Sequence, residues 1–239
     1  MVQIQEATPP DLLLRALSAA ARDHGPAAFS SSLSAEDMVI TDTILTAGID
    51  IEIFTLDTGR LHAETLEVLG AIRERYGYDV RVYKPQPDAV ASYVERHGRD
   101  AFYTSGELRH ECCRIRKVEP LKRALAGKHA WITGLRQVAG ARDRIEPVVF
   151  DHEHGLLKFN PLAQWTEAQV WSYLRTHEVP YNRLYDHGYR SIGCAPCTRP
   201  SLPGEDVRAG RWWWEQGAAK ECGLHLNEQG RLVRATETV

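Results

Sequence analysis

The stretch Ile51-Glu52-Ile53-Phe54-Thr55-Leu56-Asp57-Thr58-Gly59-Arg60 carries the strongest indication of the fold. Its first six residues have the alternating pattern of a β-strand over 51–56. The polar residues and the glycine of 57–60 mark a turn at the end of that strand. The hydrophobic and small residues that follow recur on one side of a helix: Leu61, Thr65, Val68, Leu69 and Ile72. The stretch therefore predicts a strand that ends in a polar turn and is followed by a helix.

The same alternation of strand and helix extends to both sides of this stretch. Hydrophobic periodicity and turn residues predict strands at 27–30, 80–83 and 130–133 and helices at 9–24, 87–97 and 107–126. Strands and helices that alternate in this way form a parallel, twisted sheet with helices on both faces. The ligand site of such a sheet lies at the carboxyl ends of the strands. We therefore expect an α/β fold with its site at that edge.

The pattern changes beyond residue 150. Thr166-Glu167-Ala168-Gln169 has the form of a capping box and predicts the start of one more helix. Residues 180–203 are rich in turn formers and aromatics, and residues 204–239 are polar apart from three consecutive tryptophans. We therefore expect one α/β domain over 1–203. A mobile C-terminal tail over 204–239 should make few contacts with its core.

Composition excludes several classes of partner. The chain has 239 residues, 43% of them hydrophobic, and a formal net charge of −3. This charge gives no global attraction to nucleic acid or to anionic lipid. No apolar run is long enough to span a bilayer, and the N-terminus lacks the pattern of a signal peptide. We expect a cytoplasmic protein, in which the cysteines remain thiols or bind metal rather than form disulfides.

Four of the five cysteines fall into two close pairs, Cys112-Cys113 and Cys194-Ala195-Pro196-Cys197. Two such pairs predict one site with four thiolate ligands, for zinc or for a [4Fe–4S] cluster. Adjacent cysteines on a helix point about 100° apart, which suits the spread corners of a cluster better than one ion. Pairs of buried structural cysteines are the alternative. The fifth, Cys222, is then either an inert surface thiol or a nucleophile.

Polar and basic residues at the predicted strand ends indicate a site for a small anion. The turn Ser30-Ser31-Ser32-Leu33-Ser34 leads into a helix whose first N–H groups lack partners. Asp57, Gly59 and Arg60 occupy an equivalent strand end. Lys117 follows Cys113 by four residues, which places both on one helix face. Further basic residues form clusters with Arg136, Arg142 and Arg144 and with Arg208 and Arg211. Solvated helix faces are the alternative interpretation of these clusters.

Taken together, these motifs resemble the assimilatory adenylyl-sulfate (adenosine 5′-phosphosulfate) reductases. These form the iron–sulfur branch of the phosphosulfate reductase family, which has a PP-loop, adenine nucleotide alpha hydrolase-like fold. The similarity covers most of the chain in order, through Ser30-Ser31-Ser32, 56–60, 111–117, Thr133-Gly134-Leu135-Arg136, 191–200 and 221–225. The two cysteine motifs and the terminal Glu221-Cys222-Gly223-Leu224-His225 are its most specific part.

The resemblance implies a thiol-dependent reduction of adenosine 5′-phosphosulfate to sulfite and AMP, with thioredoxin or glutaredoxin as reductant. It implies that Cys222 is the nucleophile, with His225 beside it and Lys117 near the reacting group. It also implies that Cys112, Cys113, Cys194 and Cys197 bind a [4Fe–4S] cluster. The substrate would contact residues at the strand ends and in the tail: Ser30, Ser31, Ser32, Asp57, Gly59, Arg60, Gly134, Arg136, Arg142, Arg144, Arg208 and Arg211. A homo-oligomer is compatible with these expectations.

The sequence departs from the family pattern in two places. Many members have glycine where Ser34 stands, and serine is acceptable there if its φ is negative. The loop 136–144 lacks the usual arrangement of arginines, so either Arg142 or Arg144 takes the place of the family arginine. Three alternatives remain at this stage: reduction of the 3′-phosphorylated substrate, an ATP-dependent PP-loop ligase, and a non-catalytic nucleotide-binding module stabilised by zinc.

Overall fold

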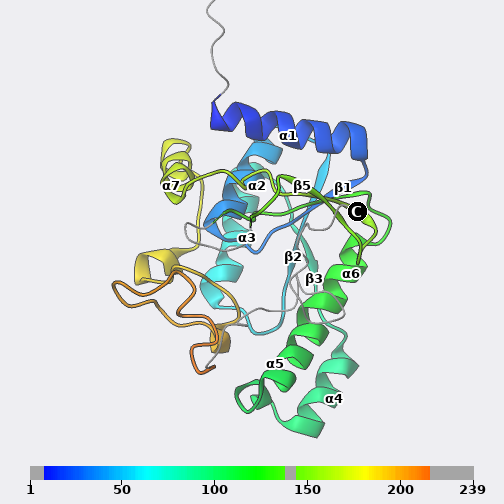
Figure 1. Cartoon of the computed structure of the whole chain (residues 1–239), viewed down its shortest axis with the longest axis vertical. Coiled ribbons are helices and arrows are strands. Elements are labelled where there is room, and N and C mark those ends of the chain that lie inside the picture. The colour runs from blue at the N-terminus through cyan, green and yellow to red at the C-terminus, as the bar shows by residue number, and fades with distance from the viewer. Residues whose placement is uncertain (1–7, 138–143, 216–239) are drawn as a thin grey trace, which may run out of the picture.

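The computed structural model of the chain describes residues 8–137 and 144–215 (Figure 1). Six strands and seven α-helices make up the described fold. The strands are β1 (Ala27–Ser30), β2 (Ile51–Leu56), β3 (Arg81–Tyr83), β4 (Ala130–Ile132), β5 (Val148–Asp151) and β6 (Leu156–Phe159). The helices are α1 (Pro9–His24), α2 (Ala35–Ala47), α3 (Ala63–Tyr76), α4 (Pro87–His97), α5 (Gly106–Cys113), α6 (Glu119–Leu125) and α7 (Glu167–Thr176).

The six strands form one sheet in the order β3-β2-β1-β4-β6-β5. The first five strands in this order run parallel, and β5 pairs antiparallel with β6 at the edge. The chain first builds outward from β1 to β2 and β3, and then returns to place β4 on the other side of β1. Open α/β sheets bind their ligands at such a reversal, beside the carboxyl ends of the strands.

The predicted α/β fold is confirmed, but the sequence pattern missed two strands. Strands at 27–30, 51–56, 80–83 and 130–133 all form, with ends that differ by one residue at most. The strands β5 and β6 have four residues each, and a turn over 152–155 rather than a helix separates them, so they lie outside the strand–helix alternation. β6 extends the parallel sheet, and β5 closes its edge.

Helices cover both faces of the sheet because strand residues alternate between the faces. Phe29 faces a large core with α1, α2 and α7, and Ala28 faces a smaller core built around α6. Figure 1 shows α1, α2 and α7 grouped together, with α5 and α6 running down the other side of the strands. Thr166 caps α7 by the predicted box with Gln169, at 3.2 Å between the hydroxyl oxygen and the backbone nitrogen.

The predicted helix over 107–126 forms as three consecutive helical segments from Gly106 to Leu125. Its middle segment, Arg114–Val118, is a π-helical turn between α5 and α6. Such turns hold one extra residue per turn and occur frequently at functional sites. Both adjacent cysteines lie at the end of α5, and the π turn carries the basic residues that follow them.

The chain after residue 203 contacts the core more closely than its polar composition indicates. Arg211 and Trp212 are only 7% and 1% exposed. Their backbones pair with residues 197–198. Arg211 forms an isolated antiparallel β-bridge with Thr198, and the Trp212 N–H donates to the Cys197 carbonyl at 3.0 Å. The expectation of few core contacts is therefore wrong for these residues. None of the helices that the structure describes has the length and apolar character needed to cross a membrane.

Candidate functional site

The serine-rich turn connects β1 to α2 at the centre of the sheet. Leu33, which is fully buried, has a positive φ of 62°. Ser34, the residue before the helix, has a φ of −78°. Any L-residue adopts this φ, so serine in place of the family glycine fits the backbone without strain. The exceptional backbone conformation of this turn lies one residue earlier, at Leu33.

The hydroxyl groups of the three serines have different partners. Ser32 donates its N–H and its hydroxyl to Asp37 Oδ2, at 2.5 Å and 2.7 Å. Ser31 Oγ accepts the Leu33 N–H at 3.2 Å. Ser30 Oγ accepts the indole N–H of Trp131 at 2.7 Å. A carboxylate of the protein therefore holds one part of the predicted anion-binding turn.

Asp37 is the residue that organises this turn, and its carboxyl group is almost fully buried. Burial raises the pKa of Asp37 to about 6, against the hydrogen bonds from Ser32, which lower it. A Cβ atom built on Gly134 would lie 1.9 Å from Asp37 Oδ1. Only glycine leaves room for the carboxylate at this position. Asp37 thus brings the end of β4 against the turn after β1.

The turn after β2 is built around Asp57 and a glycine. Asp57 Oδ1 accepts the Gly59 N–H at 2.9 Å, and Lys84 Nζ lies 3.5 Å from Asp57 Oδ2. Gly59 has a φ of +70°, in the left-handed region that favours glycine. Arg60 pairs with Asp100 at 2.6 Å and lies over the ring of Phe102. Asp57 therefore stabilises the turn, and Arg60 ties it to residues 99–102.

The two cysteine pairs, about eighty residues apart in sequence, line one cavity. Cys112 and Cys113 come from α5, and Cys194 and Cys197 from the loop after residue 190. The loop is tied to the turn after β2 by a bridge between Leu61 and Cys194. The Ala195 N–H also donates to the Arg60 carbonyl at 2.7 Å, and Thr58 Oγ1 lies 3.3 Å from Cys194 Sγ. The cysteine cavity thus lies next to the turn after β2.

Five cationic residues line the same cavity: Arg60, Arg109, Arg116, Lys117 and Arg211. Cys113 and Cys194 are each 8% exposed. Burial, with the nearby Cys194 and Cys113, raises the pKa of Cys197 to about 12, although Lys117 acts in the opposite direction. Burial also raises the pKa of Cys112. Grouped thiolates therefore need a positive partner, which a bound metal centre supplies better than side chains alone.

The residues that line this cavity fit a sulfur-rich cofactor. Within residues 8–137 and 144–215, no group of three or more His, Cys, Asp or Glu side chains is arranged to hold a metal ion. All four cysteines of the pairs nevertheless line the cavity. The indole Nε1 of Trp212, also on this cavity, is buried and has no hydrogen-bond partner among the described residues. A buried donor beside four thiols fits a group that offers sulfur acceptors.

Trp212 connects the segment after residue 203 to the cysteine cavity. The guanidinium groups of Arg109 and Arg211 lie 4.7 Å and 4.6 Å from its ring centroid, and that of Arg208 lies at 5.9 Å. Arg109 Nε donates to Glu215 at 2.5 Å, and Arg109 is only 1% exposed. Arg109 and Arg116 were predicted only as members of a basic cluster and not as individual site residues. Their position in a basic stretch around the first cysteine pair was the available signal.

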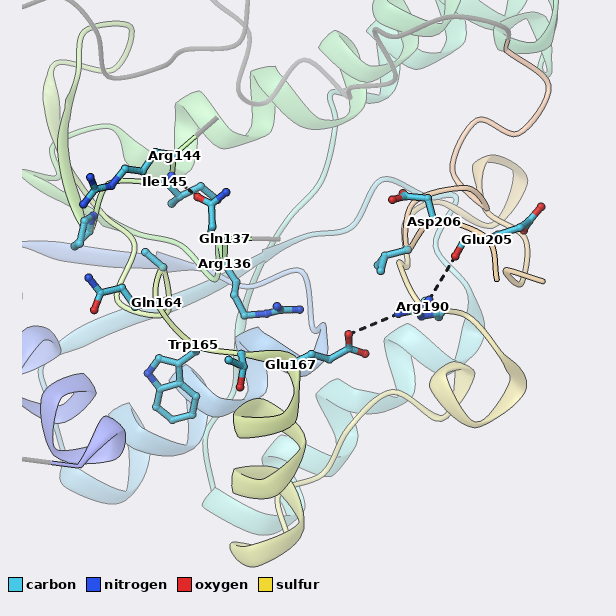
Figure 2. Close-up of a pocket in the computed structure, with 14 residues that line it drawn as sticks. Arg136, Gln137, Arg144, Ile145, Gln164, Trp165, Glu167, Arg190, Glu205 and Asp206 are labelled. Atoms are coloured by element: carbon cyan, nitrogen blue, oxygen red, sulfur yellow. Dashed lines mark hydrogen bonds and ion pairs between the residues drawn. The ribbon is translucent and has the colours of Figure 1, made fainter. Parts of the chain in front are cut away.

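Arg136 and Arg144 line a second cavity, of about 660 Å³, together with residues 163–167 at the start of α7 and residues 205–207 (Figure 2). Arg136 donates to Glu36 at 3.1 Å and 3.2 Å, so it lies beside the first turn of α2. Arg144 pairs with Glu146 at 3.3 Å. Figure 2 shows Glu167 extending from the start of α7 toward Arg190, at 3.7 Å.

The structure thus places the described site residues in three neighbourhoods. The four paired cysteines gather with Lys117, Arg60 and Arg211, while Arg136 and Arg144 line the other cavity. The serine turn and Gly134 lie between strand ends and meet through Asp37. Arg142, Cys222 and His225 lie outside the described residues.

Comparisons with known proteins agree with the motifs. Residues 26–200 match the phosphoadenosine phosphosulfate reductase domain family. The chain is 56% identical over 204 residues to an adenosine 5′-phosphosulfate reductase of Burkholderia cepacia, covering 85% of this chain and 82% of that protein. It is 54% identical over 213 residues to one of Allochromatium vinosum, covering 89% of this chain and 83% of that protein.

A solved structure confirms the fold independently. The crystal structure of phosphoadenylyl-sulfate reductase from Candida auris, in a phosphate complex, aligns with a TM-score of 0.66. It is 26% identical and covers 81% of this chain and 91% of that chain. The resemblance inferred from the cysteine motifs is therefore confirmed, and the chain belongs to the phosphoadenosine phosphosulfate reductase family.

Proposed function

We propose that this protein is an oxidoreductase of sulfate assimilation that reduces adenosine 5′-phosphosulfate to sulfite and AMP. Relatives that are 45–56% identical over most of the chain bear the name adenosine 5′-phosphosulfate reductase. The structural observation that supports this most is the convergence of the two cysteine pairs on one cavity rich in arginine and lysine.

Cys222 is the proposed nucleophile because the other four cysteines line one cavity as proposed metal ligands, which leaves Cys222 as the remaining thiol of the chain. Its thiolate sulfur attacks the sulfur atom of the phosphosulfate, and the bond from that sulfur to the phosphate oxygen breaks. AMP leaves with the bonding electron pair, and Cys222 carries the sulfonate. A dithiol reductant of the thioredoxin or glutaredoxin type then attacks the Cys222 sulfur. Sulfite leaves, and the second thiol of the reductant closes its own disulfide and restores Cys222.

Positive charge must surround the substrate because both the nucleophile and the phosphosulfate are anionic. Lys117 and Arg211 are suited to this role, since they line the cysteine cavity beside a strand end. Arg136 and Arg144 would act from the adjacent cavity. We retain as proposed substrate contacts Ser30, Ser31, Ser32, Asp57, Gly59, Arg60, Gly134, Arg142 and Arg208, and His225 as the neighbour of Cys222.

The proposed cofactor is a [4Fe–4S] cluster bound by Cys112, Cys113, Cys194 and Cys197. When bound, it would be ligated by the four thiolates and would hold α5 against the loop of residues 194–197. We propose that residues 1–203 bind nucleotide and cluster, and that 204–239 carry the nucleophile. The reaction belongs in the cytoplasm, where free thiols and dithiol reductants persist.

The test is sulfite and AMP release from adenosine 5′-phosphosulfate by anaerobically purified protein with thioredoxin. The same assay with the 3′-phosphorylated substrate separates the two family activities, and faster turnover of that substrate would reverse our assignment. Cys222→Ser should abolish sulfite release while leaving iron content and AMP binding unchanged. Sulfite release by this variant would remove Cys222 from the mechanism. Iron and acid-labile sulfide, absent from a zinc protein, test the cofactor.

A further inference from the structure

Trp131 lies beneath the serine turn, at the position on β4 that pairs with Ala28 of β1. Its side chain is 1% exposed and packs in the smaller core, against residues of α6. Its indole Nε1 donates to Ser30 Oγ at 2.7 Å, a short and therefore well-formed hydrogen bond. A buried tryptophan thus directs its one polar group at the residue where β1 enters the proposed anion site.

This hydrogen bond determines where the Ser30 hydroxyl can send its own proton. A serine hydroxyl has one proton to donate, and the indole can only donate. Ser30 Oγ must therefore accept from Trp131 and direct its proton elsewhere. The acceptor nearest to it among the described residues is the Ile132 carbonyl at 3.5 Å, beyond the usual 2.5–3.0 Å of a hydroxyl hydrogen bond.

The other serines of the turn are held differently. The Ser32 hydroxyl already donates to Asp37, the Ser34 side chain also hydrogen-bonds to Asp37, and Ser31 is only 3% exposed. Ser30 is partly exposed, and its proton has only the distant Ile132 carbonyl among the described residues. Ser30 is thus the hydroxyl of this turn best placed to donate to an anion.

A lysine fixes the tryptophan ring from the next strand. Lys158 of β6 is the register partner of Trp131, and its Nζ lies 4.5 Å from the centroid of the indole ring. Such cross-strand neighbours stabilise each other's side-chain positions. A cation over an aromatic face is attracted by the negative electrostatic potential of that face. His154 packs edge-on against the same ring at 5.4 Å, so the indole has little freedom to turn.

We propose that Trp131 is a positioning residue for substrate binding: it fixes the Ser30 hydroxyl so that its proton points to the phosphate group of the nucleotide. This rests on the proposed function, in which Ser30 contacts that phosphate. Trp131 itself does not touch the substrate. It acts by removing the alternative rotamers and donor directions of Ser30 before the anion arrives.

The experiment compares wild-type protein with Trp131→Phe, Ser30→Ala and the double variant. Phenylalanine keeps an aromatic ring under Lys158 but removes the N–H. The dissociation constant of AMP, measured by calorimetry, and the KM for adenosine 5′-phosphosulfate should each rise about threefold to tenfold in Trp131→Phe. The kcat should stay within about twofold, because the group affected orients the substrate only. In the Ser30→Ala background, Trp131→Phe should have no further effect on either constant.

Trp171→Phe serves as the matched control, because it removes the indole N–H of a tryptophan on α7 whose ring packs edge-on against the rings of Tyr181 and Tyr185. This variant should bind AMP as the wild type does. Additive effects of Trp131→Phe and Ser30→Ala would overturn the proposal, as would unchanged AMP binding in either single variant. Failure of the wild type to reduce adenosine 5′-phosphosulfate would instead refute the proposed function, while the AMP measurements would still test the positioning.

A second measurement tests the proposal with wild-type protein and Ser30→Ala, so it does not require that Trp131→Phe folds. In ¹⁵N-labelled protein, the indole N–H resonance that shifts most in Ser30→Ala belongs to the group bonded to Ser30. AMP should shift the same resonance in the wild type, because the acceptor of that N–H then changes its own hydrogen bond. If AMP leaves this resonance unmoved while shifting others, the proposal is refuted.

Discussion

Asp37 should make the stability of this protein depend on pH in a direction opposite to that of most acids. Its carboxyl group is 4% exposed, and burial raises its pKa from 3.8 to about 6. The folded protein therefore binds this proton more tightly than the unfolded chain does. The resulting stabilisation is complete below about pH 4 and is lost as the pH rises through about 6. At neutral pH the ionised carboxylate costs stability.

The size of the effect follows from the two pKa values. A difference of about two units corresponds to about 3 kcal/mol. About half of this, roughly 1.4 kcal/mol, falls between pH 5 and pH 7.5, since the unfolded carboxyl group is already ionised at the lower value. Asp37→Asn keeps an oxygen that accepts the Ser32 N–H but does not titrate. The variant should therefore gain about 1.4 kcal/mol relative to wild type between these pH values.

The assay is urea unfolding of both proteins at each pH, followed by circular dichroism. Comparing the proteins at one pH cancels the titration of every other group. Asp88→Asn, which changes an exposed carboxyl group in the first turn of α4, is the control and should show no such gain. A difference between Asp37→Asn and wild type that stays constant with pH, or that changes in favour of wild type, would refute the reasoning.

Three further predictions concern neighbouring features. Asp42→Ala should lower the free energy of unfolding by about 2–4 kcal/mol, because Tyr76 and Tyr173 both donate to Asp42 at 2.7 Å and would lose a buried acceptor; a loss below about 1 kcal/mol in urea titrations would contradict this. Gly134→Ala should destabilise by about 1–3 kcal/mol and weaken AMP binding, because its methyl group displaces the Asp37 carboxylate. Gly70→Ala, where the added methyl group meets nothing within 4 Å, is the control and should be neutral or stabilising. Cys194→Ser should lose iron and visible absorption, whereas full iron content would exclude it as a ligand.

Local sequence patterns predicted the fold where the local signal is strong. The capping box at Thr166 and the strand over 51–56 depend on residues a few positions apart, and both form as predicted. The strands β5 and β6 could not be predicted in the same way. Each has only four residues, and pairing with β4 and with each other establishes them as strands. β1 and β4 are no longer than these strands, but each lies next to a predicted helix, whereas only a turn separates β5 from β6.

The sequence predicted which types of residue form the candidate site, but it predicted few of the contacts between them. Cysteine spacing indicated a shared site, and the structure brings both pairs to one cavity. It did not indicate that Arg109 and Trp212, more than a hundred residues apart, would stack beside them. Nor did it indicate that Asp37 would occupy the donors of Ser32. Such contacts arise from tertiary packing between residues far apart in sequence. A single sequence predicts them only where they belong to a known motif.

Arg116 explains how the cysteine cavity and the strand-end turns act as one unit. It lies in the π turn directly after the first cysteine pair, and its guanidinium donates to the Thr58 carbonyl at 2.7 Å. The extra residue of the π turn changes the direction of the side chains that follow it. Gly59 lies against the same guanidinium, since a Cβ atom there would be 3.5 Å from Arg116 Nη1. Arg116 therefore links the segment directly after α5 to the turn after β2. A group bound by the four thiols would thereby stabilise the proposed substrate contacts without touching the substrate.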